Sequence, residues 1–182
     1  MKSRLATFGL LLAVLLQLVV DSRGDQIFVL LKDGAGRAVK GTSTTAGHID
    51  ELVMVGVEFG ARIPGIDEAG DPLSGSKKGE VKTINLDRFV DVASPVLFLY
   101  GLNKTPLTAK FTFRDDQSGL DYMTLEFTGF YIMNNETYLL ADENPLERLV
   151  AAFRSLKITV TPSGGQPVIG TIDTSTNTFR SH

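Results

Sequence analysis

The chain has 182 residues, of which 43% are hydrophobic and 21% are charged, and its formal net charge is −3. These values fit one globular domain with an adequate core, and the scattered charges argue against the clustered basic face that a nucleic-acid partner requires. The sequence has no Cys, which excludes disulfides, Cys-ligated zinc and thiol nucleophiles, and its two His make an all-histidine metal site unexpected. We therefore predict no cofactor and no metal site.

The first 24 residues have the layout of a secretory signal peptide. Lys2 and Arg4 precede an apolar run over residues 5–20 that only Gln17 interrupts. Small residues favour cleavage after Gly24, and cleavage after Ser22 is the alternative. An uncleaved anchor is a competing interpretation, but the sixteen residues of the run would span only about 24 Å of a hydrocarbon core of about 30 Å.

Whether the leader is cleaved or stays as an anchor, we expect the following domain to cross the inner membrane, because basic residues before an apolar run stay cytoplasmic. We expect a periplasmic or secreted protein that starts near Asp25 and keeps no stable membrane span after cleavage. Three of the 18 basic residues and one of the 21 acidic residues lie in the leader, so the exported domain would carry a formal net charge of −5.

The mature chain opens with extended segments. Residues 25–32 are almost continuously apolar, which predicts a strand covered on both faces, and residues 33–36 have turn chemistry. A weaker extended piece is predicted over residues 37–45.

A long alternating stretch runs from Gly47 to Ile63 and predicts a half-buried strand. Its predicted inward residues include Val53, Val55, Val57 and Phe59. Gly56 and Gly60 share the outer face, which indicates a bulge, a bend or a close backbone neighbour.

Residues 64–79 contain four Gly and two Pro and show no periodicity, which predicts a long surface excursion. Two interpretations stay open. The segment is either a flexible connector, which costs little because loop-closure entropy grows slowly with length, or an interaction arm.

A strand and a short helix are predicted next. Residues 80–89 form the strand, with Ile84 and Leu86 inward. Ser94 is the predicted N-cap, Pro95 suits the first helical position, and Gly101 is the predicted left-handed residue that ends the helix. Because residues 96–100 are all apolar, we expect this helix to be inserted in the core or at the end of a barrel.

Two alternating segments then predict an antiparallel hairpin, residues 106–114 and 121–134, joined by the turn at 115–119. The predicted inward residues are Ala109, Phe111, Phe113, Met123, Leu125, Phe127, Tyr131 and Met133. A polar loop follows over residues 134–145.

The last predicted long strand covers residues 149–161, with Leu156, Ile158 and Val160 inward and a bulge in its earlier part. Residues 168–172 are a weaker candidate for an edge strand. The pattern predicts a mainly β fold: an antiparallel β-barrel or two-sheet sandwich with one short side helix. We divide the chain into a leader (1–24), a β domain (25–162) and a Gly/Ser/Thr-rich tail (163–182).

His48 and Asp50 are neighbours of the kind that hydrolases use, but no Gly-x-Ser-x-Gly elbow or comparable nucleophile motif accompanies them. We interpret both residues as turn-fixing groups. The acidic pairs at 67–68, 115–116 and 142–143 are most simply solvated turn residues. No catalytic residue is predicted.

Several motifs occur together in one order. Gly47-His48-Ile49-Asp50 opens the strand to Phe59, Asp91-Val92-Ala93-Ser94-Pro95 starts the helix that reaches Gly101, and residues 156–160 form a terminal alternating strand. This combination resembles the haemolysin-coregulated protein (Hcp) family, the tube subunits of type VI secretion systems. The resemblance spans about residues 25–162.

The resemblance implies a β-barrel of two sheets with a side helix, six subunits packed as a ring, rings stacked into a tube, and no enzymatic activity. Expected partners are further copies of the chain as a homo-hexamer, components of the secretion apparatus and small effectors. The long loop would help stacked rings contact one another, through Pro64, Gly65, Asp67, Glu68, Gly70, Asp71, Lys77 and Lys78. The leader and the tail depart from the family pattern. The alternative to a ring subunit is a monomeric secreted β-barrel binding module outside any type VI apparatus.

Overall fold

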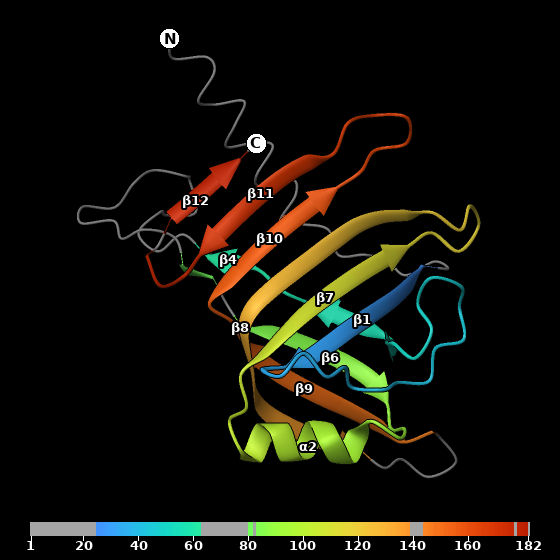
Figure 1. The fold of residues 1–182 in the computed structure, drawn as a ribbon, viewed down its shortest axis with the longest axis vertical. Coiled ribbons are helices and arrows are strands. Elements are labelled where there is room, and N and C mark those ends of the chain that lie inside the picture. Colours follow the sequence, from blue (N-terminus) through green and yellow to red (C-terminus); the bar gives the residue numbers. More distant parts are fainter. Residues whose placement is uncertain (1–24, 63–79, 82, 139–143, 177, 182) are drawn as a thin grey trace.

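The computed structural model describes residues 25–62, 80–81, 83–138, 144–176 and 178–181. Antiparallel strands and one helix, α2 (Ser94–Leu102), make up this part of the chain, which confirms the predicted mainly β class (Figure 1). The predicted leader (1–24) and the long loop (64–79) lie outside the described residues, so what was predicted for them stays a prediction.

The larger layer, called sheet A here, follows the order β12-β11-β10-β8-β7-β1-β2. Each neighbouring pair is antiparallel. Its strands are β1 (Gln26–Asp33), β2 (Leu52–Met54), β7 (Leu107–Arg114), β8 (Asp121–Tyr138), β10 (Ser155–Val160), β11 (Val168–Asp173) and β12 (Thr178–Ser181). The predicted hairpin is β7 and β8, with Ala109, Phe111 and Phe113 buried as expected.

The second layer, sheet B, consists of β3 (Gly56–Glu58), β6 (Ile84–Phe89), β9 (Leu146–Ala152) and the C-terminal half of β8. A separate two-stranded ribbon pairs β4 (Ala61–Arg62) with β5 (Glu80–Val81). Because β8 pairs with β7 and β10 at its start and with β9 at its end, it belongs to both layers.

In the described part of the chain, extended segments bend directly from one sheet into the other at three corners, and at each corner the side chains that face the core change parity. A further passage, from β6 to β7, runs through α2. The first corner is Val55, between β2 and β3. Leu52 and Met54 are buried, whereas Val53 is 37% and Val55 42% exposed. The prediction of one strand with Val53 and Val55 inward was therefore wrong, because the stretch belongs to two sheets that lie on opposite sides of the core.

The second corner is Gly129 in β8, where φ is +55° and a Cβ would lie 2.8 Å from Cβ of Arg154. Beyond it Phe130 and Ile132 are buried, so the prediction that Tyr131 and Met133 face inward was wrong. The third corner, at residues 153–154, divides the predicted last strand into β9 and β10. The predicted bulge there is this change of sheet.

The core lies between the sheets and is rich in aromatic contacts. Phe111 and Phe127 meet edge to face with ring centroids 5.2 Å apart, and Phe127 meets Phe153 at 4.8 Å. Leu97 of α2 is fully buried among these residues. Such packing is worth more than area burial alone, because the aromatic edges and faces attract one another.

The predicted tail contains a hairpin. β11 pairs with β10 over its whole length, so the weaker expectation of a strand at residues 168–172 is confirmed. β12 then pairs with β11 and forms the outermost strand of sheet A (Figure 1). The C-terminal segment thus widens the sheet that carries the core.

Candidate interaction surfaces

A buried ionic cluster fixes the start of α2 on sheet B. Arg88 and Glu147 are each 1% exposed and form an ion pair, and Nη2 of Arg88 lies 2.5 Å from Oδ1 of Asp91. The Ser94 hydroxyl donates to Glu147 at 2.9 Å. Nε of Arg88 has no hydrogen-bond partner among the described residues.

Sequence reasoning missed Arg88 and Glu147, although a signal was present. Arg88 continues the inward register of Ile84 and Leu86, and Glu147 opens the inward register of Leu149. The two lie directly opposite each other in the β6–β9 ladder. Opposite charges at inward positions of two adjacent strands indicate a buried ion pair.

The motif residues at the helix start act differently from the prediction. Ala93, not Ser94, is the N-cap, and no side chain caps the helix. The Ser94 hydroxyl instead accepts from the backbone N–H of Asp91 at 3.0 Å, and the Asp91 carboxylate accepts from the N–H of Ala93 at 2.8 Å. These bonds form a tight turn that places Pro95 in the first turn of α2.

Gly101 lies inside α2 and does not end it, which corrects the predicted left-handed cap. The left-handed residue is Lys104, with φ of +49°. A Cβ on Gly101 would lie 3.3 Å from Cγ2 of Ile132, so the glycine lets α2 approach β8 closely.

The helix covers the end of the sheets with one face and leaves the other exposed. Leu97 is its one buried residue, so of the two expected positions, inserted in the core or at the end of the β structure, the helix takes the second. Phe98 is 51%, Leu99 53% and Leu102 65% exposed. Figure 1 shows α2 lying across the end of the layers near β9. We call the exposed apolar residues of this region the α2 surface: Val92, Val96, Phe98, Leu99 and Leu102.

A second apolar row lies on the outer face of sheet B. Phe89, Leu146 and Tyr138 are direct cross-strand neighbours, and Phe89 and Tyr138 are exposed. The adjacent row is charged: Arg148 binds Asp87 with two bonds of 2.7 and 2.9 Å, and this carboxylate raises the pKa of Arg148. Contiguous exposed apolar side chains in a soluble domain mark contact surfaces. The α2 surface and the apolar row on sheet B are therefore both candidate contact surfaces.

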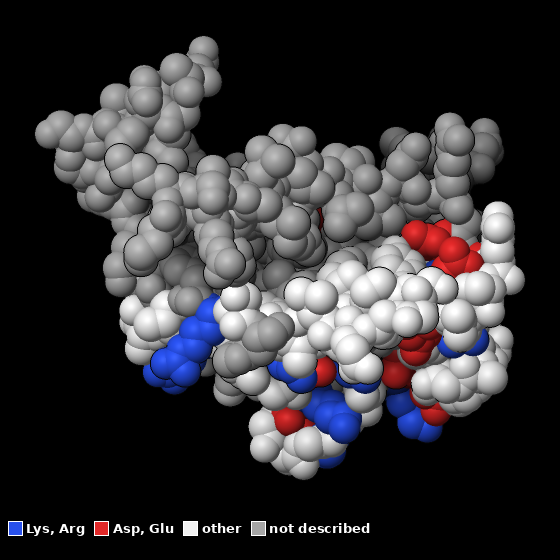
Figure 2. All heavy atoms as spheres, turned by 90° about the horizontal axis from the view of Figure 1, so that it is seen from above, with Lys and Arg blue, Asp and Glu red and all other residues white. Residues whose placement is uncertain are grey.

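Charge is mixed on the part of the surface that can be seen. In Figure 2 the basic and acidic side chains of the described residues are interspersed among uncharged ones. This distribution does not resemble the continuous basic surface that binds nucleic acid.

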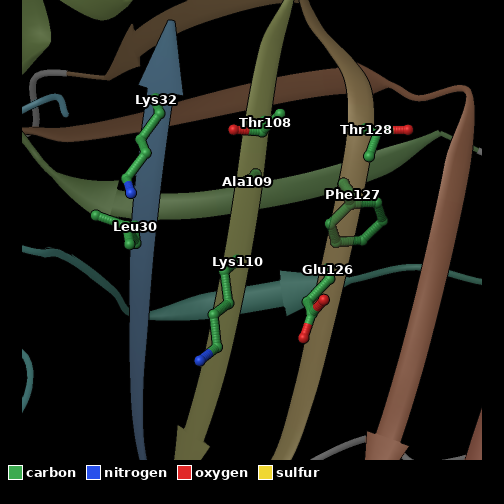
Figure 3. A pocket seen from close by; sticks show the side chains of 8 residues that line it. All are labelled: Leu30, Lys32, Thr108, Ala109, Lys110, Glu126, Phe127 and Thr128. Carbon is green, nitrogen blue, oxygen red and sulfur yellow. The ribbon is translucent and has the colours of Figure 1, made fainter. Parts of the chain in front are cut away.

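A shallow hollow of about 360 Å³ lies on the outer face of sheet A, over β1, β7 and β8 (Figure 3). Lys32 and Lys110 contribute two ammonium groups, and the Glu126 carboxylate lies beside Lys110 with Lys157 at 3.6 Å. Lys32 lies directly opposite Thr108 on β7 and shares one end of the hollow with Thr108 and Thr128, whereas Lys110 and Glu126 line the other end. The excess of positive charge suits a small anionic ligand.

The residues predicted at the opening motif do not form a dyad. His48 is buried and contacts Glu51 and Asp121 rather than Asp50. Asp50 adopts a left-handed conformation, with φ of +59°, and its carboxylate lies 3.6 Å from Nζ of Lys40. Gly47 also has a positive φ, of +88°, as the turn requires. Phe59 packs on the core.

Two further observations concern the described residues as a group. No three His, Asp or Glu side chains among them are arranged to hold a metal ion. No helix of the described ranges has the length and hydropathy needed to cross a membrane. The predicted contact loop at residues 64–79 lies outside these ranges, so none of its side chains is placed.

The family model described as "Type VI secretion system effector, Hcp" matches residues 28–160, well over half of the chain. The chain belongs to the Hcp family. The matched range includes β10 and ends before β11 and β12. None of the curated protein sequences matches this chain.

Solved Hcp structures share the fold. The chain is 21% identical to Hcp1 from Salmonella typhimurium, with a TM-score of 0.69 and coverage of 85% of this chain and 99% of that one. A structure described as a type six secretion system protein gives a TM-score of 0.72 at 16% identity, covering 85% and 99%. A type VI secretion system effector from Yersinia pestis gives 0.66 at 20% identity, covering 81% and 98%. At these identities the likeness shows the fold.

Proposed function

We propose that this Hcp-family chain is a non-enzymatic structural subunit that associates with further copies of itself into a hexameric ring and, by stacking of rings, a tube. The observation that carries the proposal is the family match over residues 28–160. The α2 surface supports it, because three side chains more than half exposed, Phe98, Leu99 and Leu102, would leave water when subunits associate.

The predicted contact loop belongs to the same proposal. Residues 64–79 follow β4, and their position in the chain corresponds to the loop that the resemblance assigns to contacts between stacked rings. Components of the secretion apparatus and small effectors are the further partners we propose. Export through the leader would place the subunit in the periplasm or outside the cell.

A sizing experiment tests the self-association. We expect the wild-type protein to run as a hexamer in gel filtration with light scattering. The double variant Phe98→Glu/Leu99→Glu should dissociate. Burial of a large apolar side chain is worth about 1.5–3 kcal/mol, so each lost contact should raise the dissociation constant by at least about tenfold.

The control is Leu120→Glu, which puts one glutamate, half the added charge of the double variant, at a 63% exposed leucine in the β7–β8 turn. Circular dichroism establishes that the variants are folded. A wild-type protein that stays monomeric at high concentration would remove the proposal. Equal dissociation of the control and the double variant would remove the assignment of the contact to the α2 surface.

A second candidate function is a monomeric secreted binding module that kept the fold and lost the ring. The hollow lined by Lys32 and Lys110 favours it, because a basic hollow on an acidic protein can select a small anion. Strictly monomeric behaviour together with saturable binding of inorganic phosphate or citrate, abolished in Lys32→Met/Lys110→Met, would support this function over the ring.

A further inference from the structure

Residues 41–51 form a loop that closes on itself. The N–H of Gly41 donates to the carbonyl of Asp50 at 2.8 Å, and the N–H groups of Ser43 and Asp50 donate to the carbonyls of Glu51 and Ser43 at 3.2 and 2.9 Å. A Cβ on Gly41 would lie 2.3 Å from the carbonyl oxygen of Glu51, so the closure requires glycine there. One side chain of this loop, His48, attaches it to sheet A.

The His48 ring lies flat on Phe28 of β1, with ring centroids 4.2 Å apart and planes 1° from parallel. Both residues are buried, at 6% and 2% exposure. The stack keeps the imidazole between two carboxylates. Nδ1 lies 3.0 Å from Oε2 of Glu51 in its own loop, and Nε2 lies 3.3 Å from Oδ1 of Asp121 at the start of β8.

Two carboxylates around one imidazole determine which form of the ring fits. An ionised carboxylate only accepts hydrogen bonds, and a neutral imidazole has one N–H donor and one acceptor nitrogen. Whichever tautomer forms, the neutral ring directs a lone pair at one of the two carboxylates. Only the doubly protonated ring donates to both Glu51 and Asp121.

The charged groups around His48 come from three elements. The loop contributes Glu51 and, on its exposed rim, Asp50 paired with Lys40 at 3.6 Å. β8 contributes Asp121. The end of β7 contributes Arg114, whose Nη1 donates to Oδ1 of Asp121 at 3.0 Å and so holds that carboxylate in place. β1 contributes the uncharged ring of Phe28.

We propose that His48 is a proton-controlled latch that joins loop 41–51 to the start of β8. With the ring protonated, the latch is closed through both carboxylates. When the ring loses a proton, it keeps the shorter bond to Glu51 and loses the bond to Asp121, which is the one that links two elements. The coupling is therefore strongest while the ring carries both protons and weakens when it loses one.

The latch depends on contacts within one chain, so it holds whether or not subunits form a ring. The decisive variant is Asp121→Asn. His48 and Arg114 contact the same oxygen, Oδ1 of Asp121. The introduced amide can turn its N–H group to this position and donate to a neutral His48 ring, and it then gives up the bond from Arg114. The variant should keep the loop attached at high pH and so lose the pH dependence without losing the contact.

The measurement is amide hydrogen exchange by NMR on the whole protein at about pH 5.5 and about pH 8, with each rate divided by its intrinsic value. The amides of Ser43 and Asp50 report loop closure, and that of Leu125 in the core serves as reference. We expect wild-type protection of the two loop amides to fall roughly tenfold over this range, the loss expected for one charge-assisted bond. In Asp121→Asn it should change less than about twofold.

Nitrogen shifts of the His48 ring give an independent readout of its protonation. A doubly protonated ring at the lower pH and a single tautomer with the proton on Nδ1 at the higher pH would support the latch. Equal pH dependence of loop protection in the wild type and in Asp121→Asn would overturn it. So would a neutral ring at both pH values with both loop amides fully protected.

Discussion

At the scale of single residues, carboxylates that accept backbone bonds do much of the positioning. Asp33, at the end of β1, accepts from the N–H groups of Ala35 and Arg37 at 2.9 Å each and from Nε of Arg37 at 2.8 Å. The Tyr100 hydroxyl of α2 reaches the same carboxylate at 3.4 Å. One side chain thus fixes the turn after β1 and contacts the helix.

Acidification should lower the free energy of unfolding, in part through protonation of Asp33. The backbone N–H of Arg37, and then its side chain, hold the pKa of Asp33 below its ordinary value. Stability from a lowered pKa is present above the unfolded-state value, near 3.8, and is lost as the pH falls through the lower folded-state value. Asp33→Asn should therefore melt lower at neutral pH and lose less on acidification than the wild type.

Thermal melts at about pH 7 and about pH 3, on either side of the aspartate range, check this expectation. Asp116→Asn, at an exposed carboxylate of the β7–β8 turn, is the control and should lose as much on acidification as the wild type. An acid loss in Asp33→Asn as large as that of the wild type would contradict the assignment.

At the scale of elements, the buried ionic cluster determines how α2 sits on sheet B. Arg88→Met would leave the buried carboxylate of Glu147 and the partly buried one of Asp91 without their cation. Breaking one side of a buried pair costs about 3–5 kcal/mol, because the remaining charge is neither paired nor hydrated. Denaturant unfolding monitored by circular dichroism measures the cost.

Arg148→Met is the matched control, because it removes an arginine that pairs with Asp87 on the exposed face of the same strand pair. Exposed pairs contribute about 0–1 kcal/mol, so this variant should be nearly neutral. The double variant Arg88→Met/Glu147→Leu should regain part of the loss, since an apolar pair can replace a buried ionic one. Similar costs for the two single variants would show that the cluster does not hold the helix.

The sequence predicted strands within one sheet well and failed at the corners. β7 lies wholly in sheet A, and its predicted inward residues are buried. The segments with Val55 and Gly129 cross to sheet B, where the inward side is reversed. An alternating sequence pattern does not show where a strand leaves one sheet and enters the other. The same inward parity was therefore assigned to residues beyond each corner, where the opposite parity holds. Gly56 and Gly129 are both local signals of a bend in the sequence, and the prediction of a bend rests on Gly56 alone.

The helix shows a different limit of sequence reasoning. An all-apolar segment of under two turns predicts burial if the chain is alone. In the structure α2 buries Leu97 and exposes Phe98, Leu99 and Leu102. The excess of apolar side chains is explained if the surface is completed by another subunit. The α2 surface could not be predicted, because a run of apolar residues in a single sequence looks the same whether it packs in the core of its own chain or against another subunit.

At the scale of the whole molecule, the two sheets, the helix and the added β11–β12 hairpin form a unit that needs no disulfide, since the chain has no Cys. Such a domain can fold in an oxidising or a reducing compartment. The fold therefore sets no limit on where a ring would assemble. If the leader directs export, it limits ring assembly to a compartment outside the cytoplasm.

The last prediction concerns the start of the exported protein. Asp25 is already held by the fold: the Tyr122 hydroxyl donates to its carboxylate at 2.8 Å, and burial, followed by this bond, raises the pKa of Tyr122. Intact-mass measurement on protein from outside the cytoplasm should show a chain that begins at Asp25 or, after the alternative cleavage, at Arg23. Since a Sec-type channel passes unfolded chains, rings would then have to form after translocation. Protein from culture fluid that retains Met1, or rings isolated from the cytoplasm, would contradict export through the leader and favour assembly inside the cell.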